Sequence, residues 1–84
     1  MTYQIPEGYK LENRLIYGHH KAYPGLLELK LHEPKKKNAL VIPTFMKMTE
    51  VINNAQEDKS VKVIMLHGGR IFSSGNDLSV FANP

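Results

Sequence analysis

The chain has 84 residues, 42% of them hydrophobic and 23% charged, so it can hold at most one small domain and is not wholly disordered. It contains no cysteine, which excludes a disulfide framework and a thiolate metal site. Eleven Lys and Arg residues against eight Asp and Glu give a net charge of +3, which suits a polyanionic small ligand but is too weak to indicate nucleic acid. No apolar run approaches the roughly 20 residues of a membrane span.

The first third of the sequence predicts an arm followed by a strand. Residues 1–13 are polar, contain Pro6 and Gly8, and are expected to form an N-terminal arm outside the core. Residues 14–17 are a short strand candidate. The first seven residues lack the basic and then apolar pattern of a secretory signal, so an intracellular location is expected.

A hairpin is predicted next. Residues 23–25 read Tyr-Pro-Gly, which is typical of a type II turn in which Gly25 takes a positive φ. Residues 27–31 alternate strictly between apolar and charged side chains, the pattern of a half-buried strand. Leu27, Leu29 and Leu31 should therefore face the core, while the long link of residues 18–22 leaves the pairing register open.

A strand–helix–strand unit follows. Pro43 suits the first turn of a helix, and an apolar stripe at spacings of three and four marks the helix face that should be buried: Phe45, Met48, Val51, Ile52 and Ala55. Residues 61–66 are nearly continuous apolar and β-branched, which is typical of a parallel strand buried on both faces. These elements predict a right-handed βαβ unit in an α/β fold.

The segment after this strand is the strongest candidate for a ligand site. Residues 67–70 are His-Gly-Gly-Arg and residues 73–77 are Ser-Ser-Gly-Asn-Asp. Small residues let backbone N–H groups converge on one point, where they can hold an oxyanion that forms at a carbonyl. The alternative is a plain turn before a short helix, with Asp77 as its cap.

Basic and histidine residues carry weaker signals. The lysines at 35–37 could contact phosphates, although a solvated loop is the more usual explanation for three lysines. His19 and His20 could be a metal pair, but no third ligand has a helpful spacing, so an exposed turn is expected and no metal site is predicted. His32 and His67 each end a strand and are interpreted as structural. Phosphate-loop and dinucleotide fingerprints are absent.

The order of three motifs resembles the N-terminal part of the enoyl-CoA hydratase/isomerase (crotonase) family. These are Lys-Asn-Ala-Leu at 37–40, Asp-x-x-Val-x-Val-Ile at 58–64 and Phe-Ser-Ser-Gly-Asn-Asp-Leu at 72–78. The last of them is similar to the Δ3,Δ2-enoyl-CoA isomerase branch, since hydratases more often have Ala-Gly-Ala-Asp there. The resemblance covers about residues 26–81, and it implies that residues 14–84 are a partial crotonase-like domain: hairpin, helix, buried strand and ligand loop of a ββα superhelix.

The resemblance also implies a site for acyl-CoA, which is a substrate and not a cofactor. The backbone N–H of Asn76 would be one oxyanion-hole donor. Lys37 and Ala39 would lie near the nucleotide end of CoA, and the thioester and pantetheine would contact Ser74, Gly75, Asn76, Asp77 and Leu78. The sequence departs from the family pattern before the loop, where His67-Gly68-Gly69-Arg70-Ile71 replaces Gly-x-Gly-Arg, and at Val41, where the family usually has a helix-capping Asn.

Two functions follow as expectations. The first is a segment of an enoyl-CoA isomerase/hydratase-type protein of fatty acid β-oxidation, in a mitochondrial or peroxisomal matrix. The family's second oxyanion donor and its catalytic carboxylates would lie beyond residue 84, so either another chain, in an oligomer or a larger complex, supplies them, or the sequence is a truncated copy. The alternative is a non-catalytic structural subunit whose apolar strand packs on a partner. A nucleic-acid module is disfavoured because no aromatic residues interleave with the lysines.

Overall fold

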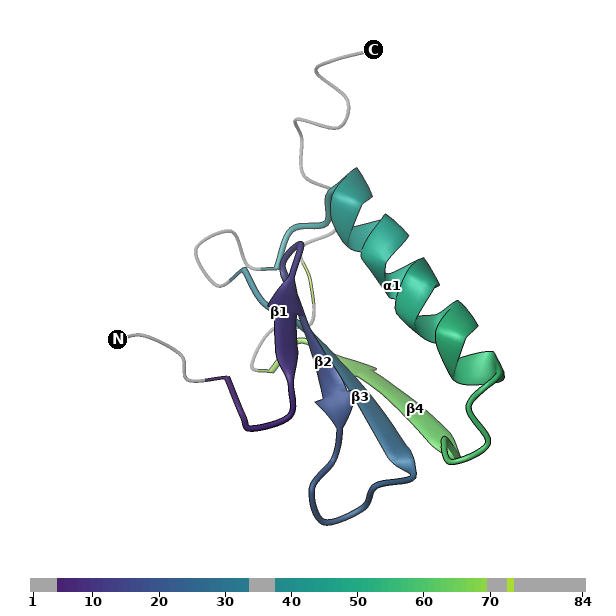
Figure 1. Cartoon of the computed structure of the whole chain (residues 1–84). Helices are drawn as coiled ribbons and strands as arrows, with labels where there is room; N and C mark the ends of the chain where they lie inside the picture. Colours follow the sequence, from purple (N-terminus) through teal and green to yellow (C-terminus); the bar gives the residue numbers. More distant parts are fainter. Residues whose placement is uncertain (1–4, 34–37, 70–72, 74–84) are drawn as a thin grey trace.

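The computed structural model describes residues 5–33, 38–69 and 73, which form one sheet with a helix against one of its faces (Figure 1). The strands are ordered β1-β2-β3-β4 across the sheet. The elements are β1 (Lys10–Glu12), β2 (Leu15–His19), β3 (Leu26–Leu31), α1 (Ile42–Gln56) and β4 (Val63–His67). This α/β arrangement agrees with the predicted fold class. No helix in the described part of the chain is long and apolar enough to cross a membrane.

The predicted hairpin is formed by β2 and β3. The two strands pair antiparallel, with Leu15 opposite Leu31 and Tyr17 opposite Leu29, which fixes the register that the sequence left open. β2 runs on to His19, beyond the predicted end at residue 17. The side chains of β3 alternate between partly buried and buried, so its leucines at 27, 29 and 31 face the core as predicted.

The turn before β3 lies where the sequence predicts it, but it is not of type II. The N–H of Leu26 donates to the Tyr23 carbonyl at 2.8 Å, which closes a four-residue turn. Gly25 is not among the residues with positive φ, whereas a type II turn requires positive φ at that position. The physical reason lies in its carbonyl, which accepts the N–H groups of Lys62 and Val63 at 2.7 and 3.1 Å and so begins the pairing with β4.

Part of the predicted arm is a strand. β1 pairs antiparallel with β2 through residues 10–12, although its side chains stay exposed. The loop between them is Asn13-Arg14, and both residues have positive φ (51° and 65°), as in the type I′ turn that suits a two-residue hairpin. Local pattern does not indicate this turn, because Arg14 stands where glycine is usual.

The strand–helix–strand unit is present. β4 pairs parallel with β3, with Leu27 opposite Ile64 and Leu29 opposite Leu66. Before α1, Val41 has extended backbone and makes no side-chain capping bond, while Pro43 lies in the first turn as predicted. The missing cap is tolerated because proline at the start of a helix has no N–H that needs a partner.

The core lies between α1 and one face of the sheet. Leu15, Leu27, Leu29, Leu31 and Val51 form its buried cluster, and Met48, Ile52 and Ala55 pack against them as the helix stripe predicts. Phe45 is an exception, since it is 41% exposed. The buried residue of that turn is Thr44, whose hydroxyl donates to the Asn13 carbonyl at 2.7 Å and ties α1 to the β1–β2 turn.

The prediction that the last strand is buried on both faces is wrong for this structure. Val63 is 57% exposed, and Ile64, Met65 and Leu66 are 38–40% exposed. β4 is the edge of the sheet, and within residues 5–33, 38–69 and 73 no strand pairs with its outer side. An apolar strand without a charged residue between 63 and 66 is unusual at an edge, where charges normally prevent association.

Candidate functional site at the carboxyl ends of β3 and β4

Most of the predicted site residues lie outside the described part of the chain. These are Lys37, Ser74, Gly75, Asn76, Asp77 and Leu78. Their placement, including the direction of the Asn76 N–H, stays a prediction. Ala39 is described: it is half-buried just before α1, and its carbonyl lies 3.5 Å from Nη1 of Arg14, which donates to it.

Asn38, which sequence reasoning did not select, is the best-defined residue near the predicted site. Its side-chain Oδ1 accepts the N–H of Glu33 at 2.7 Å, and its Nδ2 donates to the Gly68 carbonyl at 2.9 Å. Its own N–H donates to the Glu33 carbonyl at 2.8 Å. The residue is 6% exposed and has a φ of 55°. Asn38 therefore links the chain after β3 to the chain after β4.

Ser73 adds a third segment to this junction. Its hydroxyl donates to the Asn38 carbonyl at 2.8 Å, across 35 residues of sequence. The segment predicted to lie at the nucleotide end of CoA and the loop predicted to hold the thioester are thus in contact through Asn38. The sequence carried a signal for this residue, because asparagine within Lys-Asn-Ala-Leu is one of the few residues that readily adopt a positive φ.

A second polar cluster lies on the sheet face opposite α1. The hydroxyl of Tyr9 donates to Oε1 of Glu28 at 2.6 Å, and Nε2 of His67 lies 2.6 Å from Oε2 of the same carboxylate. The Tyr9 hydrogen bond, followed by the contact with His67, lowers the pKa of Glu28 in spite of its partial burial. The contact fits the structural interpretation of His67, because it anchors the carboxyl end of β4 to β3.

The backbone of Gly18 makes room for this cluster. A Cβ at Gly18 would lie 2.8 Å from Cγ of Tyr9, so the tyrosine ring crosses β2 directly over the glycine to reach Glu28. This close approach explains why a strand interior contains glycine at that position.

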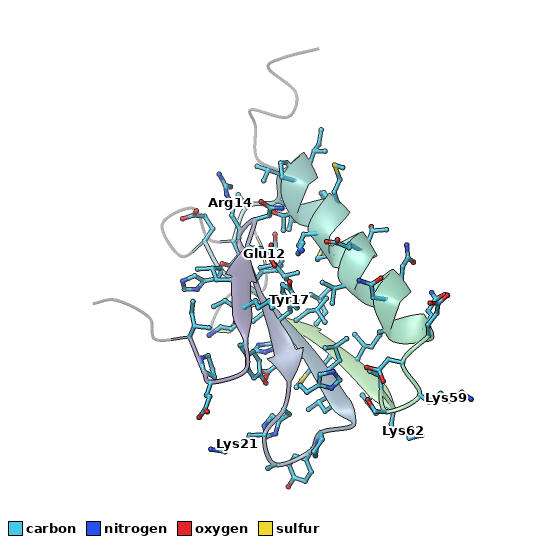
Figure 2. All side chains as sticks on the ribbon, viewed as in Figure 1. Glu12, Arg14, Tyr17, Lys21, Lys59 and Lys62 are labelled. Atoms are coloured by element: carbon cyan, nitrogen blue, oxygen red, sulfur yellow. The ribbon has the colours of Figure 1, made fainter. Side chains whose placement is uncertain are left out.

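A groove of about 580 Å³ lies between α1 and strands β1 and β2. At one end Nζ of Lys47 is 2.7 Å from Glu50 and 3.3 Å from Glu12, and it lies over the Tyr17 ring. Figure 2 shows Glu12 and Tyr17 beside each other on β1 and β2. The acidic partners, Glu50 first, raise the pKa of Lys47. None of the residues lining the groove is a predicted site residue, and the ammonium group of Lys47 is already paired with two carboxylates, so we do not assign the groove to the ligand.

The two adjacent histidines have separate local partners. Nδ1 of His19 is 2.9 Å from the Pro24 carbonyl, and its Nε2 is 3.8 Å from Asp58. His20 accepts the N–H groups of Ala22 and Tyr23 at Nδ1, at 3.1 and 3.3 Å. Among the described residues no group of three or more His, Asp or Glu side chains could hold a metal ion.

Comparison with known proteins agrees with the fold and the motifs. A family model described as enoyl-CoA hydratase/isomerase matches residues 21–84. The chain belongs to the enoyl-CoA hydratase/isomerase family. Within it, the chain is 32% identical over 59 residues to enoyl-CoA delta isomerase 3, peroxisomal, of Mus musculus, an alignment that covers 70% of this chain and 19% of the mouse protein.

Solved structures of similar proteins give the same fold. Pseudomonas aeruginosa OdaA superposes with a TM-score of 0.78 and 34% identity, covering 86% of this chain and 28% of OdaA. An enoyl-CoA hydratase/isomerase from Pseudoalteromonas atlantica superposes with a TM-score of 0.74 and 26% identity, covering 86% of this chain and 28% of that protein. The chain therefore contains part of a crotonase fold and spans less than a third of the length of these relatives.

Proposed function

We propose that this chain contributes the CoA-binding N-terminal part of an enoyl-CoA isomerase/hydratase-type protein that acts on fatty acyl-CoA in β-oxidation. The observation that carries the proposal is the junction at Asn38, where Ser73 and Gly68 are hydrogen-bonded to the segment that contains Ala39. A ligand with a phosphate-rich end and a thioester end needs two such segments held side by side. The net charge of +3 suits the phosphates.

In this proposal the backbone N–H of Asn76 donates to the thioester carbonyl. Lys37 and Ala39 contact the nucleotide end, while Ser74, Gly75, Asp77 and Leu78 line the thioester and pantetheine. A donor aimed at the carbonyl oxygen stabilises the enolate that forms when a carboxylate removes the proton α to the thioester. Losing one such donor typically costs on the order of 3 kcal/mol in the transition state.

The proposal is tested with the carbonyl group of a bound thioester as the probe. Acetyl-CoA labelled with ¹³C at its carbonyl is titrated into the 84-residue chain, and the C=O stretching frequency is measured. Asn76→Pro removes the N–H, whereas Asn76→Ala keeps it. We expect the bound carbonyl to shift to lower frequency with the wild type and with Asn76→Ala, and to shift less with Asn76→Pro. Equal spectra for all three proteins, or no binding of acetyl-CoA, would refute the role of this N–H.

Turnover is proposed to need further polypeptide. The second oxyanion donor and the catalytic carboxylate implied by the family lie in parts of its members that have no counterpart in these 84 residues. We therefore expect no isomerase or hydratase activity from these 84 residues by themselves, and activity only when further polypeptide, in a longer form of this chain or in another chain of an oligomer or larger complex, supplies both groups. The peroxisomal mouse relative supports a peroxisomal or mitochondrial matrix location, which imaging of the tagged protein would test.

A second candidate function is a non-catalytic structural subunit, and the exposure of β4 favours it. The four consecutive apolar residues 63–66 are each at least 38% exposed. Similar proteins such as OdaA are more than three times as long as the matched segment, so they contain further polypeptide that could cover this strand. Met65→Lys introduces a charge at the centre of this edge. Two results together would favour the structural role over the CoA-binding one: a protein that co-purifies with the wild type is lost from the Met65→Lys variant, and the wild type does not bind acetyl-CoA.

A further inference from the structure

Two parts of the chain that are 30 to 35 residues apart in sequence meet at one asparagine. The chain after β3 reaches Asn38 through both backbone groups of Glu33, the chain after β4 reaches it through the Gly68 carbonyl, and the loop beyond reaches it through Ser73. Four hydrogen bonds of 2.7–2.9 Å thus converge on a residue that is only 6% exposed. Such a junction fixes where the segments lie relative to one another.

The side chain at this position has to meet three demands at once. It must accept a hydrogen bond from the N–H of Glu33, donate one to the Gly68 carbonyl, and tolerate a φ of 55°. Aspartate has the same shape but no donor, so it would turn an oxygen toward the Gly68 oxygen. Glycine tolerates the backbone conformation but has neither polar group. Asparagine meets all three demands.

We propose that Asn38 is a positioning residue that holds the carboxyl end of β4, together with Ser73, against the segment preceding α1. The inference rests on the proposed function, because those two segments are the proposed contacts for the thioester end and the nucleotide end of CoA. Asn38 itself touches no reacting atom. It sets the separation of the two half-sites, so it governs the binding of a ligand long enough to reach both.

A positioning residue should affect the affinity for a long ligand more than the affinity for a short one, whereas a purely structural residue should affect both alike. Adenosine 3′,5′-bisphosphate carries only the nucleotide half of CoA, whereas acetyl-CoA spans both half-sites. Releasing β4 and its loop from the other segment removes the benefit of having both half-sites pre-arranged. The affinity for acetyl-CoA should then fall while the affinity for the short ligand stays nearly unchanged.

The decisive experiment compares Asn38→Asp with Asn53→Asp in the full chain. Asn53 is an exposed residue of α1, so the control makes the same chemical change outside the junction. Calorimetric titration with both ligands should give a loss of about tenfold or more in acetyl-CoA affinity for Asn38→Asp, with less than a twofold change for adenosine 3′,5′-bisphosphate. Asn53→Asp should change neither affinity.

Ser73 provides a second pair of variants in case Asn38→Asp fails to fold. Ser73→Ala removes the hydroxyl that donates to the Asn38 carbonyl, whereas Ser73→Thr keeps it. We expect Ser73→Ala to weaken acetyl-CoA binding selectively and Ser73→Thr to restore it. Equal losses for both ligands, or equal behaviour of the alanine and threonine variants, would overturn the proposal.

A ligand-free measurement separates failure of this inference from failure of the proposed function. NMR order parameters of the backbone amides of Gly68, Gly69 and Ser73 report the rigidity of the junction directly. They should be near 0.85 in the wild type and fall below about 0.6 in Asn38→Asp or Ser73→Ala. If the wild type binds neither ligand, the CoA function is refuted, and the same order parameters still decide on Asn38: a fall supports the positioning role and unchanged values overturn it.

Discussion

The hydroxyl of Thr44 should matter far more than that of Thr49, although both lie on α1. Each donates to a backbone carbonyl, Thr44 to Asn13 at 2.7 Å and Thr49 to Phe45 at 2.9 Å. The first bond crosses 31 residues and is made by a side chain in a residue only 1% exposed, whereas the second stays within the helix and is exposed. Substituting valine for each threonine removes the hydroxyl, keeps the shape and makes the same change in helix propensity.

The magnitude follows from what each substitution leaves behind. In Thr44→Val a part-buried hydrogen bond is lost between the exposed Asn13 and a threonine that is only 1% exposed, which costs about 1–1.5 kcal/mol. In Thr49→Val water replaces the hydroxyl, so the change should stay within about 0.5 kcal/mol. For a chain of this size, 1.5 kcal/mol corresponds to a fall in Tm on the order of 10 °C.

Urea unfolding followed by circular dichroism measures both free energies of unfolding under identical conditions. Thr44→Val should shift the midpoint to lower urea without changing the slope, and Thr49→Val should overlay the wild type. Equal effects of the two substitutions would refute the reasoning, because they would mean that the bond from α1 to the β1–β2 turn contributes nothing beyond a local hydroxyl contact.

Three further predictions concern the sheet. The pKa of Glu28 is lowered on folding, so its ionised form contributes stability that is present above its ordinary pKa of 4.5. This stability is lost as the pH falls through the lower pKa of the folded state. Glu28→Gln should therefore flatten the acid limb of a pH–stability curve relative to the wild type. Gly18→Ala should destabilise by about 1–3 kcal/mol because its Cβ would meet Cγ of Tyr9 at 2.8 Å, whereas in Gly25→Ala the nearest atom is the flexible Lys62 stem at 3.1 Å; equal unfolding midpoints for the two variants would contradict this. Met65→Lys should reduce self-association in analytical ultracentrifugation and should leave the free energy of unfolding within about 0.5 kcal/mol of the wild type. Unchanged self-association would argue against association through the β4 edge.

Several features could be read from local pattern alone. Strict alternation over residues 27–31 gave β3 and its buried face, and apolar spacing gave the α1 stripe from Met48 to Ala55. The run at 61–66 gave β4 and its parallel pairing with β3. These succeed because strand and helix periods are short, so each residue's face is decided by its near neighbours. The order of the three motifs likewise gave the family, which the match to residues 21–84 bears out.

Other features were decided only by contacts between distant segments. β1 forms because Asn13 and Arg14 both take positive φ, which nothing in their spacing requires. Phe45 is exposed and Thr44 buried because the β1–β2 turn offers a carbonyl at that point of α1. The turn at Gly25 is not of type II because the Gly25 carbonyl accepts hydrogen bonds from the chain at the start of β4.

What the sequence by itself determined is therefore the set of elements and the family, since both are written in short-range pattern. What only the tertiary structure decided is how the ligand segments meet. A buried asparagine with a donor and an acceptor can be recognised as a junction only when Glu33, Gly68 and Ser73, up to 35 residues away, are brought within hydrogen-bonding distance. Hydrogen bonds depend on direction and distance between atoms, and no sequence period encodes contacts over that separation.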